Sequence, residues 1–501
     1  MIILSLVMIL MTLVYVHYKY TFGQFRWRRV PHEKGLPLVG NMLDCILQKR
    51  HIIDVMHEIY QKFPDFPYFG FYRFCTPVFV IRDLQLARQI LVKDFNYFKD
   101  TDLHCTDDDI LLKKNIFMMK GEKWREYREK VAPMLSSGKI RLVFPLLYKT
   151  CEDLVKHIRN AEGSSTTGLE TRELSNKYTT EVIASCAFGL EANCLNNFRE
   201  DSIFREMGKK IFEPTTWTSI NITLVTAVPI LSKFINIRFV PELVTDWIIK
   251  MVQDTVQYRK DNKIKRDDFL QNLMQLHDQT DGQKFTMEDI AAQCTSFLLD
   301  GFETSGSVIC LALYEIAKNP DVQERMVKEI EEVLKGHENK VTYDAMIEMT
   351  YLDAVINETL RKWPIVAAFP RTCTKDYELP PFEGGPKRAI GIKRGDSVHV
   401  AIGSFHKDPQ YFSNPDKFDP SRFFEGSTET FTKDAFFPWG AGPRLCLGQR
   451  FAFLQIKTSV MAVVRFFKLK ISEGKDADPK LDPRSFMPRL VGGAWITYTP
   501  R

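Results

Sequence analysis

A long apolar segment from Met287 to Lys318 decides which class of fold is open to this chain. Thr286 and Asp289 have the spacing of a helix-capping pair, and Asn319-Pro320 follows the last residue, so both ends of a helix are marked. At about 1.5 Å per residue, a helix of this length crosses much of a domain. Because it is apolar nearly all round, other elements have to bury it. The chain therefore needs a large helical body.

Helical patterns are far more extensive than strand-like alternation, which is brief at residues 77–82 (PVFVIR) and 397–402 (SVHVAI). A second helix is predicted from about Tyr343 to Lys362, since Trp363-Pro364 stops it. The 501 residues allow two domains or one large mixed domain, and no internal repeat or low-complexity linker divides them. We predict a mainly α fold with a smaller β part.

The N-terminus indicates a membrane anchor. Residues 1–16 (MIILSLVMILMTLVYV) are apolar apart from Ser5 and Thr12, and a secretory signal's leading positive charge and small-residue cleavage site are both missing. Lys19 and the arginines after it favour a cytosolic C-terminal side. We predict an uncleaved transmembrane anchor at residues 1–20, a basic Pro/Gly-rich hinge at 21–41 and the main body at 42–501.

Composition excludes several classes of function. A net charge of +5 without a basic tract interleaved with aromatics argues against nucleic-acid binding. The 10 Cys include no CxxC pair and no zinc-type cluster, as expected for reduced, mostly buried cysteines. No G-x-G-x-x-G after a strand and no P-loop occur, so the chain has no evident nucleotide site. The 37 Phe and 17 Met suit a pocket for an oily ligand and suit a plain core equally well.

The segment 437–452 (FPWGAGPRLCLGQRFA) carries the strongest chemical signal. Cys446 follows a Gly- and Pro-rich turn and precedes a helix pattern, where backbone N–H groups and the helix dipole favour a thiolate. Gly440 and Gly442 allow the backbone to approach a flat cofactor closely. Arg444 can pair with an anionic group. On these residues alone, a structural cysteine buried in a glycine-rich turn is the alternative.

This segment resembles the haem-binding signature Phe-x-x-Gly-x-Gly-x-Arg-x-Cys-x-Gly of the cytochrome P450 superfamily. The matching residues are Phe437, Gly440, Gly442, Arg444, Cys446 and Gly448. The resemblance implies haem b (iron protoporphyrin IX) as the cofactor, with the Cys446 thiolate as the axial metal ligand.

Further segments match the same family in the same order along the chain. Glu358-Thr-Leu-Arg361 resembles the family's Glu-x-x-Arg helix, and Arg422 resembles the arginine that completes this buried ionic triad. The resemblance also implies that haem propionates are held by Arg371 and Arg444 and by two residues of WREYR, Trp124 and Arg128. The overall sequence pattern is most similar to that of the insect microsomal branches of the family.

The long helix resembles the one that crosses the distal face of the haem. Asp300-Gly-Phe-Glu303-Thr304-Ser305 fits the pattern Ala/Gly-Gly-x-Asp/Glu-Thr-Thr/Ser. The resemblance assigns proton delivery to Thr304 and Glu303, and it implies that Gly301 removes a side chain beside the iron. For Thr304 alone, a hydroxyl bonded to the carbonyl four residues earlier is the alternative.

Asp300 departs from the family pattern, which usually has Ala or Gly at this position. A carboxylate over a haem is costly unless it is paired or protonated. Three roles are open: an ester to a haem methyl, as for the longer Glu of the fatty-acid ω-hydroxylase branch; contact with a substrate amine; and pairing with a neighbouring donor. Pocket walls inferred from the family pattern are Phe117, Phe297, Asp300, Val366 and Ala367.

The resemblance implies a monooxygenase of the endoplasmic reticulum membrane that inserts one atom of dioxygen into a lipophilic small molecule. NADPH and flavins act only through a partner, NADPH–cytochrome P450 reductase, with cytochrome b5 as a second candidate donor. Basic residues that could steer such a partner are Arg125, Lys130, Lys433 and Arg450. The sequence leaves open whether the substrate is a xenobiotic, such as an insecticide or plant toxin, or an endogenous hormone or lipid.

Two other functions were considered. The first is a reductase-independent isomerase or dehydratase of an oxygenated lipid, and the intact Glu303-Thr304 pair argues against it. The second is a haem-bearing binding protein without turnover, which no sequence feature favours.

Overall fold

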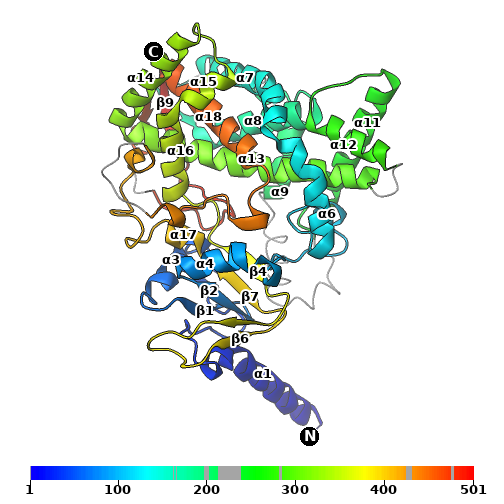
Figure 1. The fold of residues 1–501 in the computed structure, drawn as a ribbon, viewed down its shortest axis with the longest axis vertical. Helices are drawn as coiled ribbons and strands as arrows, with labels where there is room; N and C mark the ends of the chain where they lie inside the picture. The colour runs from blue at the N-terminus through cyan, green and yellow to red at the C-terminus, as the bar shows by residue number, and fades with distance from the viewer. Residues whose placement is uncertain are drawn as a thin grey trace.

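The computed structural model describes residues 2–161, 163–164, 166–196, 202–212, 238–280, 285–424, 432–475 and 479–501. A large helical body adjoins sheets of four, three and two strands, so the predicted mainly α fold with a smaller β part is confirmed (Figure 1). Elements not discussed further are α2 Leu43–Ile46, α3 Ile52–Gln61, α4 Leu84–Arg88, α5 Ile110–Lys113, α9 Ile203–Phe212, α11 Glu242–Asp261, α12 Phe269–Gln279, α14 Pro320–Gly336, α17 Ile402–Phe405, β3 Leu169–Glu170, β5 Tyr377–Leu379, β6 Ile390–Ile392, β8 Phe467–Ile471 and β9 Trp495–Pro500.

Helix α13 (Met287–Lys318) runs through the middle of the helical body (Figure 1). Its ends fall at the predicted residues: the Thr286 hydroxyl accepts the Asp289 N–H at 3.3 Å, and the Asp289 carboxylate accepts the Thr286 N–H at 2.7 Å. Among the described residues, α13 is long and apolar enough to cross a membrane, but 78% of its most apolar stretch is buried inside the protein. It is therefore a core helix, as its sequence predicts.

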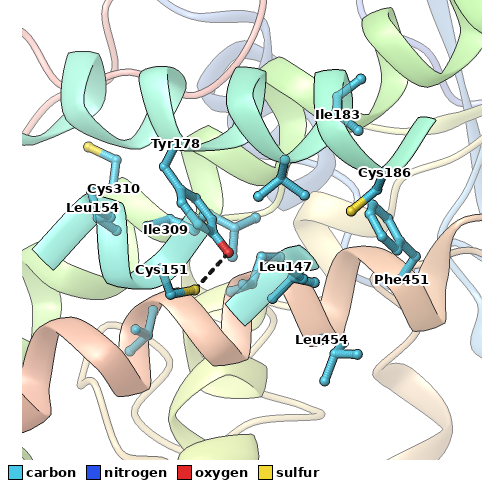
Figure 2. Packing of buried hydrophobic residues seen from close by; sticks show 14 of the residues in the cluster. Leu147, Cys151, Leu154, Tyr178, Ile183, Cys186, Ile309, Cys310, Phe451 and Leu454 are labelled. Carbon is cyan, nitrogen blue, oxygen red and sulfur yellow. Dashed lines mark hydrogen bonds between the residues drawn. The ribbon is translucent and has the colours of Figure 1, made fainter. Parts of the chain in front are cut away.

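Helices α8 (Thr171–Ile183) and α18 (Gln449–Phe466) pack directly on α13, and α7 (Ser137–Asn160) packs on both of them. Figure 2 shows their apolar side chains in one buried cluster. The fully buried Tyr178 hydroxyl lies 3.2 Å from the sulfur of Cys151, so its polar end has a partner inside the core. The packing of these helices fixes the position of α13.

The four-stranded sheet has the order β1 (Tyr68–Arg73), β2 (Thr76–Ile81), β7 (Ser397–Val400) and β4 (Phe369–Thr372). Strands β2 and β7 correspond to the two predicted strands, and they pair in parallel although they are far apart in sequence. Strand β4 pairs antiparallel with β7 and carries Arg371, one of the predicted cofactor residues. The sheet therefore brings this arginine from one half of the chain next to strands from the other.

The N-terminal helix α1 (Ile2–Trp27) corrects one predicted boundary. It continues past residue 20, so residues 21–27 are helical and not part of the hinge. The cause is packing: Phe25 is fully buried and meets the ring of Phe79 edge-on at 5.1 Å. Residues 31–41 contain no helix or strand, but isolated bridges pair His32 with Gly70 and Gly40 with Arg73, and the hinge stays a prediction.

The helix predicted at residues 343–362 is two helices, α15 (Tyr343–Glu348) and α16 (Thr350–Lys362). The chain leaves helical geometry at Met349, whose side chain is fully buried. The carboxylate of Glu329 accepts two backbone N–H groups in the first turn of α16, at 2.6 and 2.9 Å. The Glu329 carboxylate thus caps the start of α16, a helix start that the local sequence periodicity does not predict.

The predicted ionic triad is present and buried. Arg361 donates to the Glu358 carboxylate at 2.7 and 2.8 Å, and the Arg422 Nε lies 3.5 Å from the same carboxylate. Arg361 also donates to the carbonyl of His406 at 3.0 Å. The ring of His406 in turn accepts the N–H of Phe437 at 3.3 Å. The triad therefore supports the start of the loop that carries Cys446.

We predict that Arg361→Leu destabilises the protein strongly, because it leaves the buried Glu358 carboxylate without its main partner, at a cost of about 3–5 kcal/mol. The measurement is the thermal unfolding midpoint of the detergent-solubilised full-length protein by circular dichroism. If Arg361→Leu gives no folded protein, Arg361→Lys is the second variant. It keeps the charge but loses the two-pronged guanidinium contact with Glu358, so its unfolding midpoint is expected to lie below that of the wild type.

Arg141→Leu is the matched control. Arg141 makes two contacts to Asp344 at 2.6 and 2.8 Å, but both side chains are more than half exposed. Solvent screens such a pair, so the midpoint is expected to change little. Equal shifts for the two variants would contradict the structural role of the triad.

Candidate functional site

Cys446 lies in the loop just before α18, where the sequence predicts a cysteine at a helix N-terminus. Gly440 and Gly442 have φ of +85° and +70°, a region that favours glycine. A Cβ at Gly442 would lie 2.0 Å from the carbonyl oxygen of Leu91, so this glycine is also required for close packing. The N–H of Cys446 donates to the carbonyl of Trp439 at 2.8 Å. The backbone around the sulfur is therefore firmly held.

Several groups act on the Cys446 thiol. Cys446 keeps exposed surface, but desolvation by the protein around its sulfur is the largest effect and raises the pKa of the thiol to about 11. The N–H of Gly448 lowers the pKa, the charge of Asp300 raises it, and Arg128 and the N–H of Gln449 lower it. Two N–H groups and a cation directed at one sulfur suit a thiolate that a bound metal would stabilise. The coupling also shows that Asp300 and Arg128 lie within electrostatic reach of Cys446.

One strip of α13 is not covered by packing. Between residues 289 and 317, every residue is buried except Phe297, Asp300, Gly301 and Thr304. Their spacing of i, i+3, i+4 and i+7 places them on one face, which we call the α13 strip. The Thr304 hydroxyl donates to the Asp300 carbonyl, as the alternative for Thr304 anticipated. A Cβ at Gly301 would lie 2.7 Å from the Ile183 side chain, so packing against α8 also requires this glycine.

An arginine cluster lies near Cys446. The Arg444 guanidinium is 4.2 Å from the ring centre of Trp124, and that of Arg128 is 5.8 Å from it, so α6 (Gly121–Val131) and the cysteine loop meet here. Arg128 also donates to the carbonyl of Leu445 at 2.7 Å. Burial lowers the pKa of Arg444, and the nearby charge of Arg371 lowers it further. Sequence-distant arginines are therefore close enough to repel one another.

The residues present fit a haem. Arg371 is buried, its Nε has no partner among the described residues, and it donates only to the carbonyl of Pro370 at 2.9 Å. The Arg444 guanidinium is 4.0 Å from its ion-pair partner Asp100. This leaves an excess of buried positive charge, which suits a ligand with two carboxylates. A dianionic porphyrin whose metal takes the sulfur of Cys446 matches both features.

Glu303 points away from the α13 strip. Its buried carboxylate pairs with Arg172 and accepts a hydrogen bond from Asn176 at 3.1 Å, both on α8. Proton delivery by Glu303 stays a prediction, and in this structure the carboxylate would have to leave this pair to act at Thr304. Sequence reasoning missed Arg172 and Asn176, because no motif marks them and only the packing of α8 on α13 brings them to Glu303.

The other predicted site residues lie in different parts of the structure. Phe437 packs on Phe405 with ring centres 5.7 Å apart. Phe297 stacks on Phe269 at 4.6 Å and contributes to the α13 strip. Phe117 is half exposed, and Val366 and Ala367 are partly buried. Of the predicted pocket walls, Phe297 and Asp300 share one face, and the structure does not test whether the remaining three line the same space.

Arg125, Lys433 and Arg450, three of the basic residues predicted to steer a partner, are exposed, and Lys130 is partly exposed. Arg125 pairs with Glu129 at 3.3 Å on the surface of α6. Such pairs open readily in water, so the positions are accessible to an acidic partner.

Known proteins resemble the chain over its full length. A profile of the family Cytochrome P450 matches residues 30–491. The chain is 33% identical to Cytochrome P450 6k1 of Blattella germanica, over 98% of this chain and 96% of that protein. It is 33% identical to Cytochrome P450 6a2 of Drosophila melanogaster, over 97% and 96%, and 31% identical to Cytochrome P450 9b2 of the same fly, over the whole of both chains.

We predict that Cys446→Ser abolishes the red-shifted absorption band of the reduced, carbon-monoxide-bound protein, because a serine hydroxyl does not replace the thiolate. Cys75→Ser is the matched control: this partly buried cysteine contacts only the carbonyl of Leu38 at 3.7 Å, and the band is expected to persist. A red-shifted band that survives in Cys446→Ser would show that another group binds the iron.

We also predict that Arg371→Leu weakens haem retention, since it removes a buried charge-assisted contact. The haem dissociation rate, measured by transfer to an excess of apomyoglobin, is expected to rise about tenfold. Arg394→Leu, which removes an exposed arginine beyond the same sheet, should leave the rate unchanged. Equal rates for wild type and Arg371→Leu would exclude Arg371 from the cofactor site.

Proposed function

The chain belongs to the cytochrome P450 family, and from that premise we propose that it inserts one atom of dioxygen into a lipophilic small molecule. The observation that carries this proposal is the α13 strip, which lies within electrostatic reach of the Cys446 sulfur. A strip left open on an otherwise buried helix, opposite a helix-terminal cysteine, suits a site where a substrate meets a metal.

We propose haem b as the cofactor. When bound, it supplies the iron that activates dioxygen with the Cys446 thiolate as ligand. The N–H groups of Gly448 and Gln449 would hold the sulfur as thiolate. Arg371 and Arg444 would pair with the propionates, and Trp124 would orient Arg444 through its ring face.

Thr304 is the proposed proton donor in the site. Its hydroxyl now donates to the Asp300 carbonyl, and a short rotation about its side chain frees that proton for the reacting oxygen. The supply to Thr304 would come through Glu303, which would have to turn away from Arg172 and take up a proton before passing it on. The arrangement would keep bulk water out while a proton enters from the α8 side.

The electrons are proposed to come from NADPH through NADPH–cytochrome P450 reductase, with cytochrome b5 as a second candidate donor. The absence of a nucleotide motif in the sequence supports an external donor. Exposed Arg125, Lys433 and Arg450 offer positive charge for an acidic partner.

We propose that α1 anchors the protein in the endoplasmic reticulum membrane, with the catalytic domain, residues 42–501, in the cytosol. Residues 2–20 of α1 rise about 29 Å, close to the ~30 Å of a hydrocarbon core, and the last turns of the helix pack on the protein body through Phe25. Exposed apolar residues on α1, such as Met8, Met11 and Val14, support this, since their exposure in water is unfavourable. Lys19 and Arg26, in the C-terminal part of α1, would lie towards the cytosolic side.

The test is reconstitution with reductase. The full-length protein in phospholipid vesicles should consume NADPH and form oxygenated products only when reductase and dioxygen are both present. Product formation from an oxygenated lipid without either would instead support the isomerase or dehydratase considered above. Haem binding without any turnover on a broad panel of lipophilic compounds would contradict the proposal.

We predict that Thr304→Val uncouples the enzyme: NADPH is still consumed, but product per NADPH falls about tenfold or more and hydrogen peroxide rises, because the proton donor is lost. Thr295→Val is the control. Thr295 also lies on α13 and donates to the carbonyl four residues earlier, at 2.7 Å, but it is fully buried away from the strip. Equal coupling in both variants would exclude Thr304 from proton delivery.

A further inference from the structure

Asp300 is an acid without a partner in the middle of the core helix. Its side chain makes no hydrogen bond or ion pair with any residue that the structure describes. It keeps accessible surface on the α13 strip, yet protein surrounds it closely enough that burial raises its pKa to about 7. The carboxyl group therefore reaches the open strip without a partner, and the protein around it makes its charged form costly.

The other buried acids of the same helix are paired. Asp289 closes the capping box with Thr286. Glu303 pairs with Arg172, and Glu315 lies 3.0 Å from the Lys362 ammonium. The fold thus supplies partners wherever a carboxylate on α13 is buried for structural reasons. Asp300 is the exception, and it occurs where the helix faces the candidate active site.

The surroundings of Asp300 favour a cation. It lies within electrostatic reach of the Cys446 sulfur, so a thiolate there adds a second negative charge to the region. Phe297, one turn earlier on the same strip, presents an aromatic ring held by stacking on Phe269. A carboxylate and an aromatic ring on one face are the features that bind alkylammonium groups.

We propose that Asp300 is the anionic anchor of a subsite for lipophilic substrates that carry a basic nitrogen, positively charged when bound. This assignment rests on the proposed function, since it names the class of substrate that the monooxygenase site accepts. The carboxylate would pair with the ammonium group, while the apolar remainder of the molecule packs along the α13 strip. Asp300 then selects substrates and does not react.

The experiment compares two probes that differ in charge alone, benzyltrimethylammonium and its carbon isostere neopentylbenzene. The quaternary nitrogen has no lone pair and cannot ligate iron. Dissociation constants for the full-length holoprotein are measured by equilibrium dialysis, which requires no turnover. The variants are Asp300→Asn and Asp300→Glu, with Glu288→Gln as the control, because Glu288 is an exposed acid in the first turn of the same helix.

The wild type should bind the cation more tightly than the isostere. Asp300→Asn should lose that preference, with the dissociation constant for the cation rising about tenfold while that for the isostere stays constant. Asp300→Glu should keep the preference, and Glu288→Gln should match the wild type. Equal affinity of the wild type for both probes, or an unchanged preference in Asp300→Asn, would overturn the proposal.

Two further measurements distinguish this proposal from a failure of the proposed function and from an ester bond between Asp300 and haem. The reduced, carbon-monoxide-bound spectrum of each variant tests the haem site, so a missing red-shifted band marks failure of the proposed function and not of the subsite. Extraction of denatured protein with acidified organic solvent tests an ester between Asp300 and haem. Haem that stays with the wild type but leaves Asp300→Asn would mean that the carboxyl is consumed by that bond, and the amine subsite would be excluded.

Discussion

Helix α13 is apolar on nearly every side and can exist only where other helices cover it. Helices α8 and α18 pack on it, and α7 shares one core with all three (Figure 2). The same packing places Cys446, just ahead of α18, within electrostatic reach of Asp300 on α13. The position of the candidate site is thus a consequence of how the core helix is buried, and the α13 strip is the part of this helix that the packing leaves uncovered.

Buried charge in this protein falls into two groups with different meanings. Most buried ions are closely paired, as in the cluster of Glu358, Arg361 and Arg422 and in the pair of Glu303 with Arg172. Arg371 and Asp300 are the contrast, because neither has a counter-ion among the described residues. Since a charge without a counter-ion is expensive when protein surrounds it, these two groups point to ligands. The cation matches an anionic cofactor, and the anion matches a cationic substrate.

Local signals predicted local structure well. The capping pair gave the start of α13 because its side chains close hydrogen bonds within the first turn, and Asn319-Pro320 gave its end. The predictions failed where distant residues intervene. The carboxylate of Glu329 starts α16 and divides the helix predicted at 343–362. Burial of Phe25 against the sheet extends α1 into the predicted hinge. No pattern of neighbouring residues contains either interaction.

The sequence by itself determined the class of fold, the cysteine at a helix start and the membership of the cytochrome P450 family, because these depend on residue types at short, fixed spacings. Only the tertiary structure decided which charges meet. It turned Glu303 toward Arg172, brought Arg371 near Arg444, and left Asp300 without a partner. Electrostatic pairing depends on distances between elements far apart in the chain, and these distances exist only once the helices have packed.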